Sequence, residues 1–137
     1  DFAPSAIESL RNTITQKKLK VKVLQKNIFD LLPKYENLFD YVIEQTCFCA
    51  IHPSHRSAYE DVVRGILRTG GHLVGLWFPL DKNLSEGGPP YGTTIKEVKS
   101  YFNLNWETKR EEFSQHSVKS RKNREKLIIF KKIDSVE

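Results

Sequence analysis

The chain has 137 residues, of which 39% are hydrophobic, and its 22 Lys and Arg residues outnumber 17 Asp and Glu residues to give a formal net charge of +5. This length fits one compact domain with a hydrophobic core. No run of about 18 uncharged apolar residues occurs, and the first residues lack the basic and apolar pattern of a secretory signal. The two cysteines, Cys47 and Cys49, are too close in sequence to favour a disulfide. We therefore expect residues 1–137 to form one domain of a cytoplasmic protein that does not bind a membrane.

The positive charge is concentrated in two runs, QKKLKVK at residues 16–22 and KSRKNREK at residues 119–126. Basic clusters of this kind can bind the phosphates of RNA or the carboxylates of an acidic partner. Neither run is interleaved with the aromatic side chains on which single-stranded nucleic acids stack. Solvated surfaces explain the runs better than nucleic-acid contact does, and a non-enzymatic binding domain for RNA or an acidic partner is the alternative function.

The hydrophobic pattern predicts helices that alternate with strands. In chain order the expected elements are a helix at 4–18, strands at 21–25 and 38–44, a helix at 54–71, a strand at 72–78, a helix at 93–102, and strands at 106–113 and 126–133. Gly70 and Gly71 provide the expected end of the second helix. The strand at 38–44 has few polar positions and should be buried on both faces, whereas 106–113 alternates as an edge strand does.

This order of elements predicts an α/β fold, with a mostly parallel sheet and helices on both faces. In such sheets the ligand binds beyond the carboxyl ends of the strands. The informative segments are therefore residues 1–2, 26–30, 44–49 and 79–91.

The stretch EQTCFCAIHPSHR at residues 44–56 places two cysteines and two histidines within nine positions. Zinc normally takes its ligands from two pairs that are separated by a longer loop, so four ligands this close together are crowded. We therefore expect no metal site here. Buried cysteines behave as small apolar side chains. His52 and His55, at the start of a predicted helix, are expected to cap it or to face solvent.

Four ordered blocks of the sequence carry a family resemblance. FDYVIEQTCFCAIHPSHR is followed by LRTGGHLVGLWFPLD, GGPPYGTT and REKLIIFKK. In this order and spacing they closely resemble the thiopurine methyltransferase and thiol and halide methyltransferase family, over nearly the whole chain. The resemblance implies a Rossmann-like class I fold, S-adenosylmethionine as the cofactor, and a small thiol, thiopurine or halide as the methyl acceptor.

The resemblance also implies a set of cofactor-binding residues: Asp1, Phe2, Asn27, Ile28, Glu44 and Gln45. Asp1 stands where an acidic residue of the family holds the two ribose hydroxyls. Phe2 and Ile28 would pack against the adenine, and Asn27 stands where the family often has an aspartate that accepts from the adenine amino group. Glu44 would lie at the end of a strand beside the cofactor, and its burial would require hydrogen bonds.

The same resemblance implies acceptor-binding residues: Gln45, Phe48, Pro90 and Tyr91. Some relatives carry arginine at the position of Gln45, so a charged donor for an anionic acceptor is missing there. The stiff loop SEGGPPYGTT would present Tyr91 to the acceptor. The cofactor already carries the activated methyl group, and a thiol of low pKa supplies its own thiolate, so we assign no catalytic residue.

The first part of the family fold is unaccounted for in this sequence. A class I methyltransferase has a first strand and a glycine-rich loop before the acidic ribose ligand, and no GxGxG pattern occurs in the chain. We therefore expect the chain to be the C-terminal portion of a methyltransferase domain that is incomplete at the N-terminus. By itself it should be inactive, and an N-terminal fragment of the same protein is an expected partner.

Overall fold

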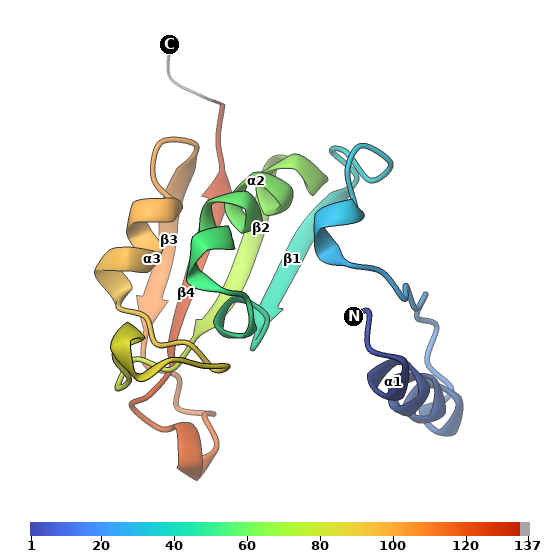
Figure 1. Ribbon diagram of the computed structural model, residues 1–137. Helices are drawn as coiled ribbons and strands as arrows, with labels where there is room; N and C mark the ends of the chain where they lie inside the picture. Colours follow the sequence, from blue (N-terminus) through green and yellow to red (C-terminus); the bar gives the residue numbers. More distant parts are fainter. Residues whose placement is uncertain (135–137) are drawn as a thin grey trace.

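The computed structural model describes residues 1–134. In chain order its elements are α1 (Pro4–Lys17), β1 (Phe39–Gln45), α2 (Arg56–Ile66), β2 (Leu67–Trp77), α3 (Ile95–Tyr101), β3 (Trp106–Glu112) and β4 (Lys126–Lys132), as Figure 1 shows. The first helix, α3 and the strands at 38–44, 72–78, 106–113 and 126–133 all occur where the hydrophobic pattern predicts them. No helix in the described residues is long and apolar enough to cross a membrane.

The four strands form one sheet in the order β1-β2-β4-β3. Strands β1 and β2 are parallel and are connected through α2, whereas β4 runs antiparallel to both β2 and β3. The fold is α/β, as predicted, but the sheet of this chain is mixed rather than mostly parallel. Strand β3 is an edge strand, as its alternating sequence indicates. The carboxyl ends of β1 and β2 lie at the same end of the sheet, where α/β folds bind their ligands.

Helix α2 ends earlier than the sequence indicates. It stops at Ile66 and β2 begins at the next residue, so Gly70 and Gly71 lie in a strand. The register between the parallel strands shifts in this region: Phe39 pairs with Leu67, but Tyr41 pairs with His72. Gly70 has a φ of 87° within the irregular stretch, a conformation that glycine adopts without strain. The two glycines therefore mark a bulge rather than the end of the helix.

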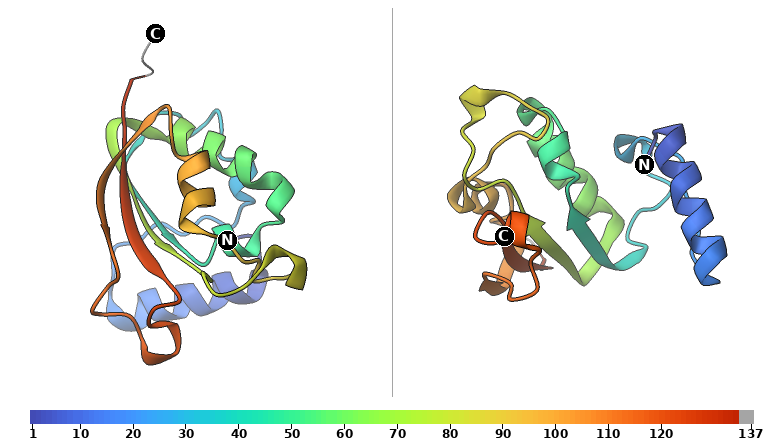
Figure 2. Two further views of the ribbon diagram at one scale, coloured as in Figure 1. Left: turned by 90° about the vertical axis from the view of Figure 1, so that its left-hand side faces the viewer. Right: turned by 90° about the horizontal axis from the view of Figure 1, so that it is seen from below.

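The core lies between the sheet and helices α2 and α3, which cover the same face (Figures 1 and 2). It is rich in aromatic rings, which include those of Phe48, Tyr59, Trp77, Phe102, Trp106 and Phe130. The ring of Phe102 stacks on Phe130 with centroids 5.3 Å apart, and Trp77 lies at the same distance from Phe102. Such pairs contribute about 0.5–1.5 kcal/mol each beyond burial. The ends of β1 and β2 are thus held on a well-packed platform.

The opposite face of β1 is open. Tyr41 and Ile43 are 64% and 71% exposed, so the prediction that residues 38–44 are buried on both faces is wrong for this chain. Helix α1 lies apart from the sheet beyond the β1 edge (Figures 1 and 2), and helices therefore cover one face instead of the expected two. Residues 21–25, predicted as a strand, pair with no strand of the described chain, and a strand needs a neighbour for its backbone hydrogen bonds.

Candidate functional site

Three cavities open at the carboxyl ends of β1 and β2. The N-terminal cavity, of about 450 Å³, is lined by Asp1, Phe2, Lys26, Asn27, Ile28, Phe29, Gln45, Thr46, Cys47, Ala50, Ile51, His52 and His55. The β3–β4 cavity, of about 510 Å³, is lined by Gln45, Thr46, Leu76, Ser114, His116, Ser117, Val118, Ser120, Arg121 and Glu125. The proline-loop cavity, of about 290 Å³, is lined by Thr46, Cys49, Ala50, Phe78, Pro89, Pro90 and Arg121. Thr46 lines all three, so they adjoin at the end of β1.

The N-terminal cavity joins segments that are distant in sequence. The backbone N–H of Lys26 donates to the carbonyl of Asp1 at 3.0 Å. The exposed Asp1 carboxylate accepts from the backbone N–H of Ala3 through Oδ1, at 2.9 Å, which leaves Oδ2 for a ligand. The amide oxygen of Asn27 accepts from the N–H of Phe29 at 3.0 Å and retains one lone pair. Five of the six residues predicted to bind the cofactor line this cavity: Asp1, Phe2, Asn27, Ile28 and Gln45.

Glu44, the sixth of these residues, is only 3% exposed and lines none of the three cavities. Its Oε1 accepts from Tyr59 Oη at 2.6 Å and from the N–H of Phe48 at 2.8 Å, and its Oε2 accepts from the N–H of Cys47 at 3.3 Å. Burial raises the pKa of this carboxyl, and the three hydrogen bonds oppose the shift. The predicted hydrogen bonding is confirmed. The carboxylate holds the turn after β1, however, and does not reach the cavity, contrary to the prediction of a cofactor contact.

Phe48, predicted to contact the acceptor, belongs to the core. It is 2% exposed, and its ring packs edge-on against Tyr59 and Trp77, with centroids 5.6 Å and 5.3 Å away. The guanidinium of Arg56 covers it at 4.4 Å. These neighbours leave no surface of the ring for a ligand, so its role is to support the wall of the site and not to touch the acceptor.

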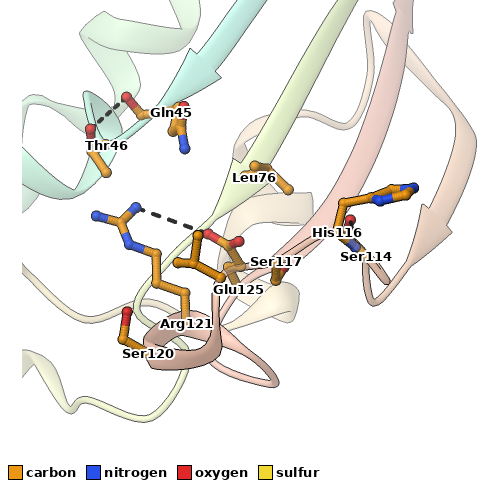
Figure 3. Close-up of a pocket in the computed structure, with 10 residues that line it drawn as sticks. Gln45, Thr46, Leu76, Ser114, His116, Ser117, Ser120, Arg121 and Glu125 are labelled. Atoms are coloured by element: carbon orange, nitrogen blue, oxygen red, sulfur yellow. Dashed lines mark hydrogen bonds and ion pairs between the residues drawn. The ribbon is translucent and has the colours of Figure 1, made fainter.

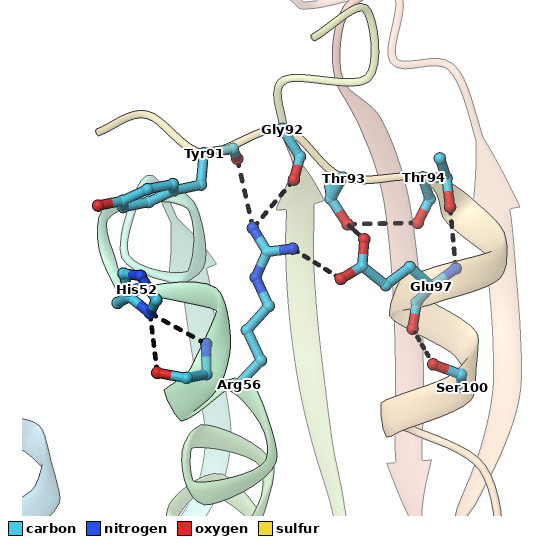
Figure 4. Close-up of polar contacts among 9 residues, drawn as sticks. His52, Arg56, Tyr91, Gly92, Thr93, Thr94, Glu97 and Ser100 are labelled. Atoms are coloured by element: carbon cyan, nitrogen blue, oxygen red, sulfur yellow. Dashed lines mark hydrogen bonds and ion pairs between the residues drawn. The ribbon is translucent and has the colours of Figure 1, made fainter. Parts of the chain in front are cut away.

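Arg56 fastens the proline-rich loop to α2 and α3 (Figure 4). Its Nη1 donates to Glu97 Oε1 at 2.8 Å, and its Nη2 donates to the carbonyls of Tyr91 at 3.3 Å and Gly92 at 3.1 Å. The other oxygen of Glu97 accepts from Thr93 Oγ1 at 3.2 Å. The Arg56 side chain is fully buried. A buried charge is tolerated only when it is paired and hydrogen-bonded, so this network sets the conformation of the loop.

Tyr91 lies where that loop returns to the end of β1. Its backbone N–H donates to the carbonyl of Cys49 at 2.7 Å, and its ring lies 5.5 Å from that of His52 (Figure 4). The His52 side chain accepts from the N–H of Ser54 at 3.2 Å and caps the following turn, which confirms its predicted capping role. His52 lines the N-terminal cavity and Pro90 lines the proline-loop cavity. The two predicted acceptor residues of the loop thus stand beside the cavities.

The β3–β4 cavity brings charged residues to the end of β1 (Figure 3). Arg121 and Glu125 come from the connection between β3 and β4 and lie across the cavity from Gln45. The Arg121 guanidinium lies 4.6 Å from the ring centre of Phe78. Sequence reasoning assigned this basic run to solvent and missed both residues. No local signal distinguishes Arg121 from its basic neighbours, because only the return of β4 beside β2 brings it next to Gln45.

Cys47 and Cys49 follow β1 in the turn that Glu44 holds. Both are free thiols. Burial, and then the nearby Glu44 carboxylate, raise the pKa of Cys47 to about 11, and the same two causes raise the pKa of Cys49. Both groups are therefore thiols at neutral pH and behave as small apolar side chains. Among residues 1–134, no group of three or more His, Cys, Asp or Glu side chains is placed to hold a metal ion.

The fold matches those of solved S-adenosylmethionine-dependent methyltransferases. One from Methanosarcina mazei superposes with a TM-score of 0.74 at 17% identity, covering 97% of this chain and 80% of that one. The 1,6-didemethyltoxoflavin-N1-methyltransferase of Burkholderia thailandensis, solved with S-adenosylhomocysteine, has a TM-score of 0.66 at 15% identity, covering 91% of this chain and 56% of that one. The chain therefore has the predicted Rossmann-like class I methyltransferase fold.

Residues 2–135 match the thiopurine S-methyltransferase family, and the chain belongs to that family, which confirms the resemblance seen in the four sequence blocks. Thiocyanate methyltransferase 1 of Brassica oleracea is 28% identical over 137 residues, covering 98% of this chain and 59% of the relative. Probable thiol methyltransferase 2 of Arabidopsis thaliana is 35% identical over 95 residues, covering 69% of this chain and 41% of the relative. The chain thus spans about three fifths of the length of the first relative.

Proposed function

We propose that the protein transfers the methyl group of S-adenosylmethionine to a small soft nucleophile, which is a thiol, a thiopurine or a halide. The observation that carries this proposal is the gathering of Asp1, Phe2, Asn27, Ile28 and Gln45 around one cavity that adjoins a second cavity at Gln45 and Thr46. Membership of the thiopurine S-methyltransferase family supports it, as do the names of the thiocyanate and thiol methyltransferases among the relatives.

The N-terminal cavity suits the chemistry of the cofactor. The free oxygen of Asp1 can accept from ribose hydroxyls. Phe2 and Ile28 offer apolar surface to the adenine, and the remaining lone pair of Asn27 can accept from its amino group. A volume of about 450 Å³ lies within the range of small-molecule sites. When bound, S-adenosylmethionine supplies an activated methyl group on a sulfonium sulfur.

The β3–β4 cavity is the proposed acceptor site. It shares Gln45 and Thr46 with the N-terminal cavity, so an acceptor held there lies next to the cofactor. Arg121 brings a positive charge to the cavity, which compensates for the absence of arginine at Gln45. Pro90, on the loop that Arg56 holds, lines the adjoining proline-loop cavity, and Tyr91 follows it in that loop. Alignment of the acceptor in a dry site is the main contribution expected of the protein.

The open face and edge of β1 support a further part of the proposal. Tyr41 and Ile43 are exposed apolar side chains on a strand that has one edge unpaired within residues 1–134. We propose that residues 1–137 belong to a single methyltransferase domain, whose remaining elements cover this face, and that an N-terminal fragment of the same protein supplies them.

The two free thiols are consistent with a cytoplasmic location, where cysteines stay reduced.

Calorimetric titration of the complete protein with S-adenosylhomocysteine tests the cofactor site. We expect micromolar binding, and a loss of about ten-fold in Asp1→Asn, because a charged hydrogen-bond acceptor is replaced by a neutral one. Asp30→Asn is the control, since Asp30 is exposed and lies outside the cavity lining.

Methyl transfer is then measured with a thiol, a thiopurine and iodide as acceptors. Transfer to at least one of them is the expected result. Absence of S-adenosylhomocysteine binding, or transfer to none of the acceptors, would contradict the proposed function. Affinity for RNA that falls steeply with added salt would instead favour the non-enzymatic binding domain.

A further inference from the structure

Thr46, the residue that follows β1, has an unusual backbone conformation for its side chain. Its φ is 58°, in the left-handed region, where the Cβ of a branched side chain crowds the backbone. The other non-glycine residues with a positive φ among residues 1–134 are Lys18, Asn37 and Asn123, none of which is β-branched. Thr46 is exposed, so packing of the core does not require its side chain. Strain that packing does not explain points to a role in the site.

The left-handed turn is imposed by the buried carboxylate of Glu44. Its Oε1 accepts from the N–H of Phe48 at 2.8 Å, and its Oε2 accepts from the N–H of Cys47 at 3.3 Å. These hydrogen bonds join the end of β1 to the two residues that follow Thr46. Tyr59 Oη, on α2, donates to the same carboxylate at 2.6 Å and holds it in place. The chain must therefore turn back at Thr46, and the surrounding structure maintains the strain.

Thr46 lies where the proposed cofactor and acceptor sites meet. It lines the N-terminal, β3–β4 and proline-loop cavities. Methyl transfer from a sulfonium is a direct displacement, so the methyl carbon must lie between the donor sulfur and the acceptor atom. With the cofactor in the N-terminal cavity and the acceptor in the β3–β4 cavity, the methyl group must lie near the two residues that both cavities share, Gln45 and Thr46.

The Thr46 hydroxyl is oriented to act as a hydrogen-bond acceptor. Its Oγ1 donates to the backbone carbonyl of Gln45 at 2.7 Å (Figure 3). Because this bond uses the hydroxyl proton, the oxygen offers only lone pairs to a ligand. A methyl group on a sulfonium sulfur has positively polarised C–H bonds, and such bonds are weak hydrogen-bond donors. The lone pairs of Thr46 suit a group of this kind.

We propose that Thr46 positions the group that is transferred. Its hydroxyl oxygen accepts weak hydrogen bonds from the methyl group that bound S-adenosylmethionine presents to the β3–β4 cavity. The left-handed turn serves this contact, because it places Thr46 at the junction of the cavities. This inference rests on the proposed function, which puts the cofactor and the acceptor in adjoining cavities. It adds a residue that contacts the methyl group itself.

Two ligands that differ at the methyl position test the inference by equilibrium binding to the complete protein. Sinefungin carries an ammonium group where S-adenosylmethionine carries the sulfonium methyl, whereas S-adenosylhomocysteine has no substituent there. We expect Thr46→Val, which keeps the branched shape, to bind sinefungin about ten-fold more weakly than the wild type, because a hydrogen bond from a charged group is lost. Its affinity for S-adenosylhomocysteine should be unchanged. Thr46→Ser, which keeps the hydroxyl, should retain both wild-type affinities.

Thr108→Val is the matched control, since Thr108 is exposed on β3 and lines none of the three cavities. It should leave both affinities unchanged. If Thr46→Val does not fold, Thr46→Ala removes the same oxygen and carries the same prediction.

The melting temperature tests the strain separately. Asparagine tolerates the left-handed region better than a β-branched residue does, so Thr46→Asn should raise the melting temperature by about 2–4 °C. Thr108→Asn, the same change at a residue without a positive φ, should not raise it.

Three results would overturn the inference. They are an unchanged affinity of Thr46→Val for sinefungin, an equal loss of affinity for both ligands, and a melting temperature that Thr46→Asn does not raise. Absence of S-adenosylhomocysteine binding to the wild type rejects the proposed function instead, so the two failures are distinguishable.

Discussion

The guanidinium of Arg56 lies 4.4 Å from the centre of the Phe48 ring, and both side chains are buried. Phe48 belongs to the turn after β1, Arg56 begins α2, and the same guanidinium binds the carbonyls of Tyr91 and Gly92. One side chain therefore joins three walls of the site. A desolvated cation above an aromatic ring contributes about 2 kcal/mol, and the hydrogen bonds add to this.

Replacement of Arg56 by lysine should lower the free energy of unfolding by about 1–3 kcal/mol, because an ammonium cannot reproduce the fork that serves Glu97 and two carbonyls at once. Denaturant unfolding measures the change. Arg68→Lys is the matched control: Arg68 pairs with Asp40, both side chains are more than half exposed, and such pairs contribute little. Equal losses in the two variants would show that the buried network has no special role.

The stability of the protein should depend on pH through Glu44. Burial raises the folded-state pKa of this carboxyl above its ordinary value of 4.5. The folded protein therefore binds this proton more tightly than the unfolded chain, and the contribution of Glu44 to stability decreases as the pH rises through that value. The difference in free energy of unfolding between the wild type and Glu44→Gln should accordingly fall as the pH rises above about 4.5. A difference independent of pH would contradict this assignment.

Cys47 should resist alkylation in the folded protein. Its pKa of about 11 leaves little thiolate at pH 8, and the thiolate is the reactive form. In a Cys49→Ser background, we expect iodoacetamide to react roughly 100-fold faster with the unfolded chain, where the thiol has its ordinary pKa of about 8.5. The folded-state rate should keep rising as the pH approaches 11. Similar rates in the two states would mean that the turn after β1 is open to solvent.

Gly92→Ala should disrupt the proline-rich loop. A Cβ at this buried position would overlap the backbone carbonyl of Lys82, which cannot move aside as a flexible side chain can. We expect a loss of about 1–3 kcal/mol or more in the free energy of unfolding, together with weaker acceptor binding, because the carbonyl of Gly92 also binds Arg56. Ser85→Ala, an exposed change in the same loop, should leave both quantities unchanged. An unaltered melting temperature in Gly92→Ala would refute the close approach.

Local patterns predicted elements well where neighbours in sequence decide the structure. The helix at 93–102 and the edge strand at 106–113 appear as α3 and β3, because their periodicity alone determines which face is buried. The end of the helix predicted at 54–71 was wrong, because Gly70 serves a bulge that exists only when β2 pairs with β1. The same limit applies to residues 21–25, which have strand composition but no partner strand in the described chain.

The residues predicted for the candidate site were likewise placed partly in the cavity and partly in the core. Family motifs led to Asp1, Asn27 and Gln45, and the structure brings all three to one cavity. They also led to Glu44 and Phe48, whose side chains turn to the core, because adjacent positions around a strand end face different ways. Which of these positions faces the core depends on the face of the sheet that α2 covers, and the sequence alone does not reveal that face.

The sequence by itself determined the family, the α/β class and the segments that follow the strands, because motifs, hydrophobic periodicity and strand order are properties of the chain in one dimension. Only the tertiary structure decided that Arg121 and Glu125 join Gln45 in one cavity, and that Arg56 closes the loop over Phe48. Glu125 lies 80 positions from Gln45 (125 − 45). Such distant side chains meet only when β4 pairs with β2, and the charge and hydrogen bonding of the site arise from that pairing.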